Sequence, residues 1–177
     1  MRRSVLITAC FVVACGDQST PVEPSLRAPS THSANLSSAV VQSANGSAIR
    51  WTAGEPFLSS FEAQKHADGS VTGRFHADAK YLNARFDVAV TCLSVQGNTA
   101  WIGGIIEKSG TPLIQVGLAS YFYVIDTGEG AVGAIQLDIV SALRINDTPG
   151  SELTFCADRP TTLPFRRIED GNVQVHE

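Results

Sequence analysis

The sequence has little charge, no excess of basic residues and no apolar run long enough to cross a membrane as a helix. Charged residues make up 17% of the 177 residues, and 17 acidic residues outweigh 13 basic ones, for a net charge of −4. Soluble domains typically carry roughly 25% charged residues. Because nucleic-acid-binding surfaces need clustered Lys and Arg, no nucleic-acid partner is expected. The 44% hydrophobic content supplies a core for about one domain and excludes a wholly disordered chain.

Several sequence motifs that would indicate a catalytic or cofactor site are also absent. The sequence contains no GxxxxGK[ST] phosphate loop, no GxSxG nucleophile elbow and no CxxC pair. The histidines His66, His76 and His176 do not have the spacing of a metal site. We therefore expect no cofactor and no metal site built from these residues. A non-enzymatic role is favoured over an enzymatic one.

The first fourteen residues have the features of an export signal. Arg2 and Arg3 precede an apolar run of ten residues, Val5–Ala14, whereas a membrane-spanning helix needs around 20. The run ends in VVAC at Cys15, the pattern of a bacterial lipobox, in which the cysteine is acylated. ITAC at Cys10 also fits but leaves a shorter apolar region, and a plain secretory signal is the other alternative. We expect a bacterial, extracytoplasmic protein anchored to an envelope membrane through Cys15, with the membrane and leaflet left open.

Residues 15–46 are expected to form the lipidated cysteine and a disordered tether. The segment 16–46 has no aromatic residue, and 12 of its 31 positions are Ser, Thr or Pro. Such a composition buries too little apolar surface to offset the entropy of ordering the chain. This leaves residues 47–177 as the folded domain.

The folded part alternates with a period of two, with turn residues between the apolar runs, which predicts an all-β domain. The expected strands are Phe57–His66, Ser70–Ala79, Arg85–Val95, Thr99–Lys108, Ile114–Asp126, Ala134–Ile145, Glu152–Ala157, Phe165–Glu169 and Asn172–His176. Ala134–Ile145 also fits a short helix. We expect a single antiparallel up-and-down β-barrel of about eight or nine strands, closed by pairing near Ile49–Thr52 with the terminal strand; a β-sandwich is the alternative.

The first hairpin can be predicted to its register. A three-residue loop at Ala67-Asp68-Gly69, with Gly69 in the left-handed conformation, makes paired residue numbers sum to about 136. Phe61 then faces Phe75 on one side of the sheet, and Glu62 faces Arg74 on the other. A two-residue loop would pair apolar with polar residues, so the cross-strand pairs favour the longer loop.

The second hairpin leaves its register undecided. Arg85–Val95 and Thr99–Lys108 flank Gln96-Gly97-Asn98, and apolar residues occupy both parities of the first strand. That pattern indicates burial on both faces over part of the strand. The pair Gly103-Gly104 would weaken the second strand unless it marks a bulge, a bend or a close backbone approach.

Two cysteines remain after the signal and the anchor are assigned. Cys10 leaves with the signal and Cys15 carries lipid, so Cys92 and Cys156 stay in an oxidising compartment and are expected to form a disulfide. The bond would close a loop of about 65 residues and stabilise the fold by about 4 kcal/mol. Two buried free thiols are the alternative.

The most polar cluster is the segment from Asp126 to Gly130, which holds Asp126 and Glu129. The favoured reading is a turn between two strands, with Asp126 accepting hydrogen bonds from backbone amides. A Ca²⁺ site and an acid–base pair for glycoside hydrolysis are the alternatives, and the separation of the two carboxyls decides the latter. Four aromatic residues are candidates for a sugar-binding or apolar pocket, although strand aromatics more often belong to a core: Trp51, Trp101, Tyr121 and Tyr123.

Four segments resemble an uncharacterised family of secreted bacterial all-β domains, some described as post-COAP type. The segments are SFEAQKHADGSVTGRF, VAVTCLSVQGNTAWIGG, FYVIDTGEG and EDGNVQVHE, and the match spans most of the range 60–177. The chain departs from the family pattern in lacking a proline in the Asp126 loop and an aromatic residue at Ser59. The resemblance implies an all-β extracytoplasmic domain and carries over no catalytic residues.

The sequence thus favours a lipid-anchored, non-catalytic surface or binding module, with the barrel interior or an exposed sheet face as its site. The alternative is a small-ligand-binding barrel of lipocalin-like or allene-oxide-cyclase-like type, with a small molecule or carbohydrate as the partner. A hydrolase that uses Asp126 and Glu129 is the third hypothesis. The oligomeric state stays open.

Overall fold

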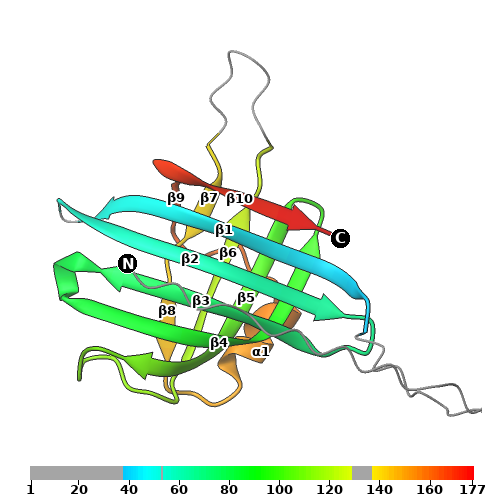
Figure 1. Ribbon diagram of the computed structural model, residues 1–177, viewed down its shortest axis with the longest axis horizontal. Helices are drawn as coiled ribbons and strands as arrows, with labels where there is room; N and C mark the ends of the chain where they lie inside the picture. The colour runs from blue at the N-terminus through cyan, green and yellow to red at the C-terminus, as the bar shows by residue number, and fades with distance from the viewer. Residues whose placement is uncertain (1–37, 53, 129–136) are drawn as a thin grey trace, which may run out of the picture. The chain divides into compact units, whose positions relative to one another are not determined.

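The computed structural model describes residues 38–52, 54–128 and 137–177. The chain divides into two units, Met1–Asn35 and Leu36–Glu177, and the described residues belong to the second. Figure 1 shows them as strands with one short helix and one turn of 3-10 helix. The elements are β1 Val40–Thr52, β2 Glu55–His66, β3 Val71–Ala79, η1 Lys80–Leu82, β4 Ala84–Gln96, β5 Thr99–Ser109, β6 Ala119–Ile125, β7 Ile139–Ser141, β8 Arg144–Asn146, α1 Ser151–Asp158, β9 Phe165–Arg167 and β10 Asp170–His176.

The strands form one antiparallel sheet that curls into a half-barrel. Neighbouring strands follow the order β10-β1-β2-β3-β4-β5-β6-β7-β9, and β8 pairs with β6. In Figure 1, β1 to β4 cross in front of the steeper β5 to β7, which shows the curl. The predicted all-β class and single antiparallel sheet are confirmed. Within the described strands, β9 and β10 end the strand order and do not pair with each other, so the sheet is a half-barrel and not a closed barrel. These strands form one sheet, whereas a β-sandwich has two.

The register predicted for the first hairpin is confirmed. Phe61 pairs with Phe75 and Glu62 with Arg74 between β2 and β3. Gly69 lies in the turn with a φ of 86°, the left-handed conformation that the three-residue loop requires. The apolar pair faces the core, where Phe61 is 5% exposed. Matching of pairs on both faces at once is what fixes this register.

The turn of the second hairpin is shorter than predicted. Gln96 pairs with Thr99, so Gly97 and Asn98 alone form the turn between β4 and β5. Gly97 has a φ of 59°, as two-residue hairpin turns demand at such a position. The expected three-residue loop across Gln96-Gly97-Asn98 is therefore wrong by one residue.

A β-bulge in β4 explains why apolar residues occupy both parities of this strand. The register between β4 and β5 shifts between Val90 and Cys92, so Thr91 is an extra residue without a partner in the ladder. Before the bulge Val90 faces the core, and after it Leu93 and Val95 face the same core. Cys92 is buried on the opposite face. The predicted burial on both faces therefore holds at Cys92, while the change of parity comes from the bulge.

The two consecutive glycines of β5 mark close approaches, as predicted. A Cβ on Gly103 would lie 2.8 Å from the Sγ of Cys92 and 2.9 Å from the Cβ of Glu152, which belongs to α1. A Cβ on Gly104 would collide with the backbone carbonyl oxygen of Ala89 on β4. Gly103 thus lets α1 and the disulfide sit directly on β5.

The first strand begins earlier than the composition indicated. β1 starts at Val40, so residues 40–46, assigned to the tether 15–46, belong to the sheet, and the predicted boundary at residue 47 is wrong. Ala44 is fully buried in this stretch. A Cβ on Gly46 would lie 3.0 Å from the Cα of Val173, so small residues suit a strand with two close neighbours. The same small residues resemble a linker when composition alone is considered.

The terminal strand pairs with β1, at an offset from the predicted position. Ser43–Ile49 of β1 pairs with Asp170–His176 of β10, whereas the expected partner of the terminal strand was Ile49–Thr52. Figure 1 shows β10 beside β1 along the edge of the sheet. The predicted meeting of the two ends of the domain is therefore confirmed, about five residues nearer the start of β1.

The segment predicted as the strand Glu152–Ala157 is the helix α1. Its buried residues Glu152, Phe155 and Cys156 are spaced by three and four, the period of a helix face against the sheet. Gly150 precedes the helix with a φ of 76°. A segment of eight residues is too short for periodicity to separate a helix from a strand, which is why the sequence pattern misled.

The remaining C-terminal strands are shorter than predicted. β6 begins at Ala119 rather than at Ile114. The predicted strand Ala134–Ile145 lies partly outside the described residues, and its described part contributes to the two three-residue strands β7 and β8. β9 likewise has three residues.

The sheet packs a core on each face. The inner core fills the centre of the half-barrel, where Phe122 lies 5.5 Å from Phe61 and 4.7 Å from Phe75 between ring centroids. The outer core is smaller and lies under α1; it consists of Trp101, Tyr123 and Phe155. The centre of the half-barrel is thus filled by side chains.

Candidate functional site

Asp126 accepts hydrogen bonds from backbone amides, as expected of the favoured interpretation, while Glu129 and Gly130 of the predicted turn lie outside the described residues. Its Oδ1 accepts a hydrogen bond from the backbone N–H of Gly128 at 2.8 Å, and its Oδ2 accepts one from the N–H of Val175 at 3.1 Å. Both carboxylate oxygens are therefore occupied by backbone donors. Glu129 lies outside the described residues, so the separation on which the hydrolase and calcium hypotheses depend stays untested.

A second carboxylate, Asp138, was not found from the sequence. Its side chain is buried: Oδ1 accepts from the N–H and the hydroxyl of Thr127 at 2.9 and 3.2 Å, and Oδ2 accepts from the N–H of Val173 at 2.7 Å. Asp138 and Asp126 thus accept hydrogen bonds from the N–H groups of Val173 and Val175, on the edge of β10 that faces away from β1. They join the open ends of the half-barrel where strand pairing does not. Backbone donors leave no signal in a sequence.

Of the three histidines that the structure describes, His176 is exposed and His66 and His76 are half-buried on strands. The Nδ1 of His76 and the Oδ1 of Asp87 are 2.6 Å apart, and Ser60 is the neighbour of His76 on β2. In the described part of the chain no hydrogen bond links Ser60 to His76. Ser60, His76 and Asp87 therefore lack the contact between nucleophile and base that a hydrolytic site needs. Residues 38–52, 54–128 and 137–177 contain no cluster of three metal-ligating side chains.

The predicted disulfide is present. Cys92 of β4 and Cys156 of α1 are bonded, with their Cα atoms 6.1 Å apart and 64 positions apart in the chain. The bond ties α1 to the outer face of the sheet. Cys15 lies outside the described residues, and lipidation there stays a prediction.

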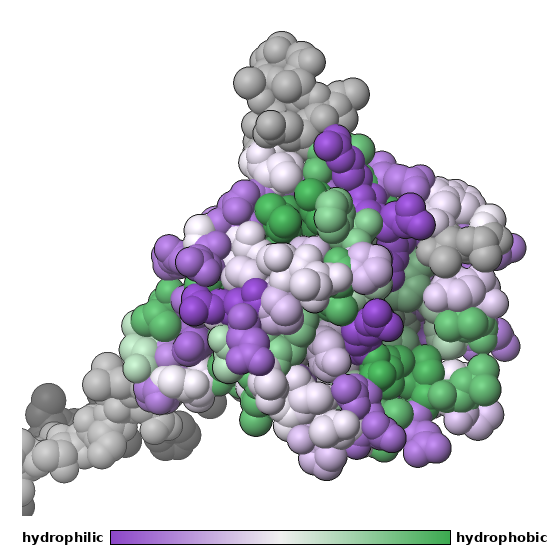
Figure 2. Space-filling model, turned by 180° about the vertical axis from the view of Figure 1, so that it is seen from behind, coloured by the Kyte–Doolittle hydropathy of each residue, from purple (hydrophilic) through white to green (hydrophobic). Residues whose placement is uncertain are grey.

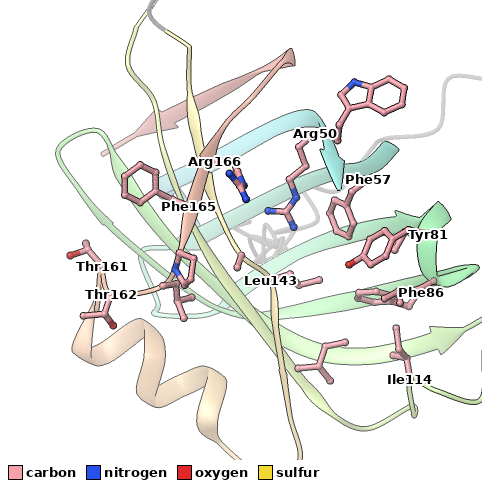
Figure 3. Close-up of a pocket in the computed structure, with 17 residues that line it drawn as sticks. Arg50, Phe57, Tyr81, Phe86, Ile114, Leu143, Thr161, Thr162, Phe165 and Arg166 are labelled. Carbon is pink, nitrogen blue, oxygen red and sulfur yellow. The ribbon is translucent and has the colours of Figure 1, made fainter. Parts of the chain in front are cut away.

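A cavity of about 830 Å³ opens at the end of the half-barrel where β1 turns into β2. Figure 3 shows its two sides facing each other across the opening. β1, β2, η1 and β4 supply one side with Arg50, Phe57, Tyr81 and Phe86. The segment 161–166 and the stretch around Leu143 supply the other. The size lies within the range of small-molecule sites, about 300–1,000 Å³.

The mouth of the cavity carries exposed apolar side chains. Trp51 and Phe165 line it and are 56% and 57% exposed, and Leu82 is 47% exposed. Figure 2 shows hydrophobic residues at the molecular surface among hydrophilic ones on the rear face. Of the four aromatic residues considered for a pocket from the sequence, Trp51 alone lines this cavity. An apolar ligand would meet apolar surface before it enters.

Arg50 reaches from β1 across the interior of the cavity. Its guanidinium lies over the ring of Phe57, with Cζ 4.3 Å from the ring centroid. One nitrogen, Nη1, donates a hydrogen bond to the carbonyl oxygen of Ser141 in β7 at 3.1 Å. The Nε is buried without a hydrogen-bond partner. Arg50 is thus a partly buried cation that bridges the two sides of the half-barrel.

The electrostatic surroundings of Arg50 disfavour its charge. Burial is the main cause that lowers the pKa of Arg50 below its usual value; Tyr81 acts in the opposite direction, and the positive charge of Arg166 lowers the pKa further. Among the described lining residues, Arg50 and Arg166 are the charged ones. The cavity is therefore positive and apolar at once.

The outer core holds the wall formed by residues 161–166. The hydroxyl of Tyr123 donates to the carbonyl oxygen of Leu163 at 3.2 Å, and the indole N–H of Trp101 donates to that of Pro160 at 3.0 Å. Burial raises the pKa of Tyr123, which keeps the phenol protonated as a donor. These contacts fix the wall from the side that faces away from the cavity.

One sequence signal could have found Arg50. The residues of β1 that face the core alternate as Ala44, Gly46 and Ala48, and Arg50 continues this parity. A charged residue on the apolar parity of a strand is unusual enough to mark a site. Arg166 gives no such signal because β9 is too short to show a period.

No protein-family model, curated protein or solved structure matches the chain. The resemblance to the post-COAP-type family therefore stays a prediction. Within the described residues, no helix has the length and apolar character needed to span a membrane.

Proposed function

We propose that this protein is a non-catalytic, lipid-anchored extracytoplasmic module that binds a small, largely apolar ligand in the cavity of the half-barrel. The observation that carries the proposal is the cavity itself, about 830 Å³ and lined by aromatic and aliphatic side chains with a few polar groups. Sites for small molecules have this composition, because apolar walls supply affinity and few polar groups supply orientation.

The packing around the cavity supports a site that exists before the ligand arrives. The inner core fills the centre of the half-barrel up to Phe57 and Phe86, which line one side of the cavity and are 6% and 3% exposed. On the opposite side, the bonds from Tyr123 and Trp101 hold the wall. A preformed site spends less of its binding free energy on ordering its own side chains.

Ligand binding is tested with the neutral fluorophore N-phenyl-1-naphthylamine, whose emission rises in apolar surroundings. The protein is the full chain with Cys15→Ser, which removes the proposed acyl chains that would themselves take up the probe. Ala142→Phe places a ring inside the cavity that Ala142 lines and is expected to weaken binding by about tenfold. Ala67→Phe is the matched control, since Ala67 is exposed in the turn between β2 and β3.

Saturable binding that Ala142→Phe weakens and Ala67→Phe does not would support the proposal. Absence of binding, or equal binding by both variants, would overturn it. Near-ultraviolet circular dichroism of each variant establishes that the fold is retained, since a loosened core also binds such dyes.

The anchor rests on the sequence and has its own test. Two or more acyl chains give stable membrane attachment where one chain is marginal. Cys15→Ser is expected to move the protein from the membrane fraction to the soluble fraction of cells that express it. Cys10→Ser is the matched control and should leave the protein in the membrane. Retention of the Cys15→Ser variant in the membrane would show that the anchor lies elsewhere.

A further inference from the structure

Two positive charges share the cavity without an acidic partner. Arg50 and Arg166 line it, and none of the other described lining residues is acidic. The ion pairs of the described residues join His76 to Asp87 and Asp78 to two basic neighbours, and none of these residues lines the cavity. In Figure 3 the guanidinium groups of Arg50 and Arg166 extend into the same space from opposite sides.

The bonding of Arg50 is incomplete. A guanidinium has five N–H donors in a planar fork. The protein supplies one acceptor, the carbonyl oxygen of Ser141, and leaves the buried Nε without one. An unsatisfied buried donor destabilises the fold, because it has lost its hydrogen bonds to water without replacement. A purely structural brace between β1 and β7 would explain the bond to Ser141 but not the open donors or the second arginine.

The apolar surfaces lie around these charges. Phe57 packs against the guanidinium of Arg50, and Phe86, Ile114 and Leu143 line the cavity beside it. Figure 3 shows Phe57, Tyr81 and Phe86 on one side of the opening and Leu143 facing them. A ligand that fills the cavity would therefore place its polar end near the arginines and its apolar body along these side chains.

We propose that the ligand is an amphiphile with one anionic head group, held between Arg50 and Arg166, and an apolar body that lies against Phe57, Phe86 and Leu143. The inference rests on the proposed function and adds the chemical class of the ligand. Planar guanidinium groups bind carboxylate and phosphate oxygens through paired N–H···O bonds, so either head group fits. The head would supply acceptors for the open donors of Arg50 and offset the repulsion between the two cations.

The experiment compares two dyes that share one ring system. 8-Anilino-1-naphthalenesulfonate carries a sulfonate that N-phenyl-1-naphthylamine lacks. Their affinities for the full chain with Cys15→Ser are measured by fluorescence titration. The anionic dye is expected to bind about tenfold more tightly than the neutral one, because its sulfonate accepts charge-assisted hydrogen bonds that the neutral dye cannot make. The ratio of the two affinities is the readout.

Variants assign the preference to the arginines. Arg50→Gln is expected to lower the ratio about tenfold, and Arg166→Gln, which is exposed, about threefold. Arg50→Lys keeps the positive charge and should retain part of the preference for the anionic dye. It replaces Arg50→Gln in the experiment if that variant disturbs the fold. Arg167→Gln is the matched control, since Arg167 is exposed and does not line the cavity.

The two sources of an anionic head are separated by competition. Dodecanoate, dodecyl phosphate and dodecanol are each used below their micelle-forming concentrations to displace the bound sulfonate dye. Displacement by dodecanoate alone identifies a carboxylate ligand, and displacement by dodecyl phosphate alone identifies a phosphate ligand. Equal displacement by dodecanol and both anions would contradict the inference.

The outcomes separate this inference from the proposed function. If both dyes bind with equal affinity, or the Arg50 and Arg166 variants leave the ratio as it is, the anionic ligand is wrong while the binding module stands. If neither dye binds, the proposed function fails and the inference fails with it. A ratio that falls equally in Arg167→Gln would show a general effect of net charge and would also overturn the inference.

Discussion

The two sides of the cavity are built by different means. β1 to β4, which have nine to thirteen residues each, supply one side and are hydrogen-bonded along most of their lengths to their neighbours. The other side comes from β8 and β9, which have three residues each, from Ala142 and Leu143, and from the segment 161–164. The first side is a continuous ladder, whereas the second depends on a few separate contacts.

This difference predicts where the molecule is easiest to disturb. Short strands and loops open locally at lower free energy than long paired strands. The wall at 161–166 is held by the disulfide through α1, by Tyr123 and Trp101 from behind, and by the pairing of β9 with β7. Loss of one such contact should therefore loosen the wall while the hairpin β2–β3 stays intact.

The largest effect should come from removal of the disulfide. Cys92→Ser combined with Cys156→Ser is expected to lower the free energy of unfolding by about 4 kcal/mol, because the unfolded chain regains the freedom of a closed loop. Denaturant titration measures the loss. Hydrogen exchange should show faster opening in α1 and residues 160–164 than in β2 and β3. Uniform acceleration across all strands would contradict the proposed difference between the two sides.

A smaller effect is expected where Asp138 joins the two open ends of the half-barrel. Asp138→Asn keeps the size of the side chain but removes the charge that three donors share, and should cost about 2 kcal/mol. Thermal and denaturant unfolding measure the change. Asp147→Asn, the same substitution at an exposed position, is the matched control and should change stability by less than about 0.5 kcal/mol. Equal effects would show that Asp138 does not join the ends.

The smallest effect concerns the long hairpins and is seen only in acid. Hydrogen bonds from Arg85, and next from Lys80, lower the pKa of Asp78 below its ordinary value of 3.8. A folded-state pKa below the unfolded value stabilises the fold above pH 3.8, and the stabilisation is lost as pH falls through the folded pKa. Asp78→Asn should therefore flatten the fall in stability below about pH 4, measured by unfolding at a series of pH values. An unchanged slope would show that these bonds do not matter. The effect is small because Arg85 and Lys80 are exposed.

The first hairpin could be predicted because its sequence contains two independent patterns that agree. Phe61 opposite Phe75 and Glu62 opposite Arg74 satisfy one register on both faces. The disulfide could also be predicted, since Cys92 and Cys156 were the remaining pair once the signal and the anchor had been assigned. In both cases the partners are side chains, which the sequence names.

The features that were missed depend on backbone geometry or on short segments. The bulge at Thr91 and the donors that face Asp138 are backbone features without a residue signature. α1 and β9 are too short for periodicity. The cavity itself arises where long and short strands meet, so no single segment predicts it.

β1 has a consequence for how the protein presents its cavity. Val40, where the rest of the chain joins the sheet, pairs with His66 beside the β2–β3 turn, and Arg50 lies near the other end of the same strand. Ten residues of extended strand separate the two, about 33 Å. The point of attachment and the entrance therefore lie at opposite poles of the half-barrel.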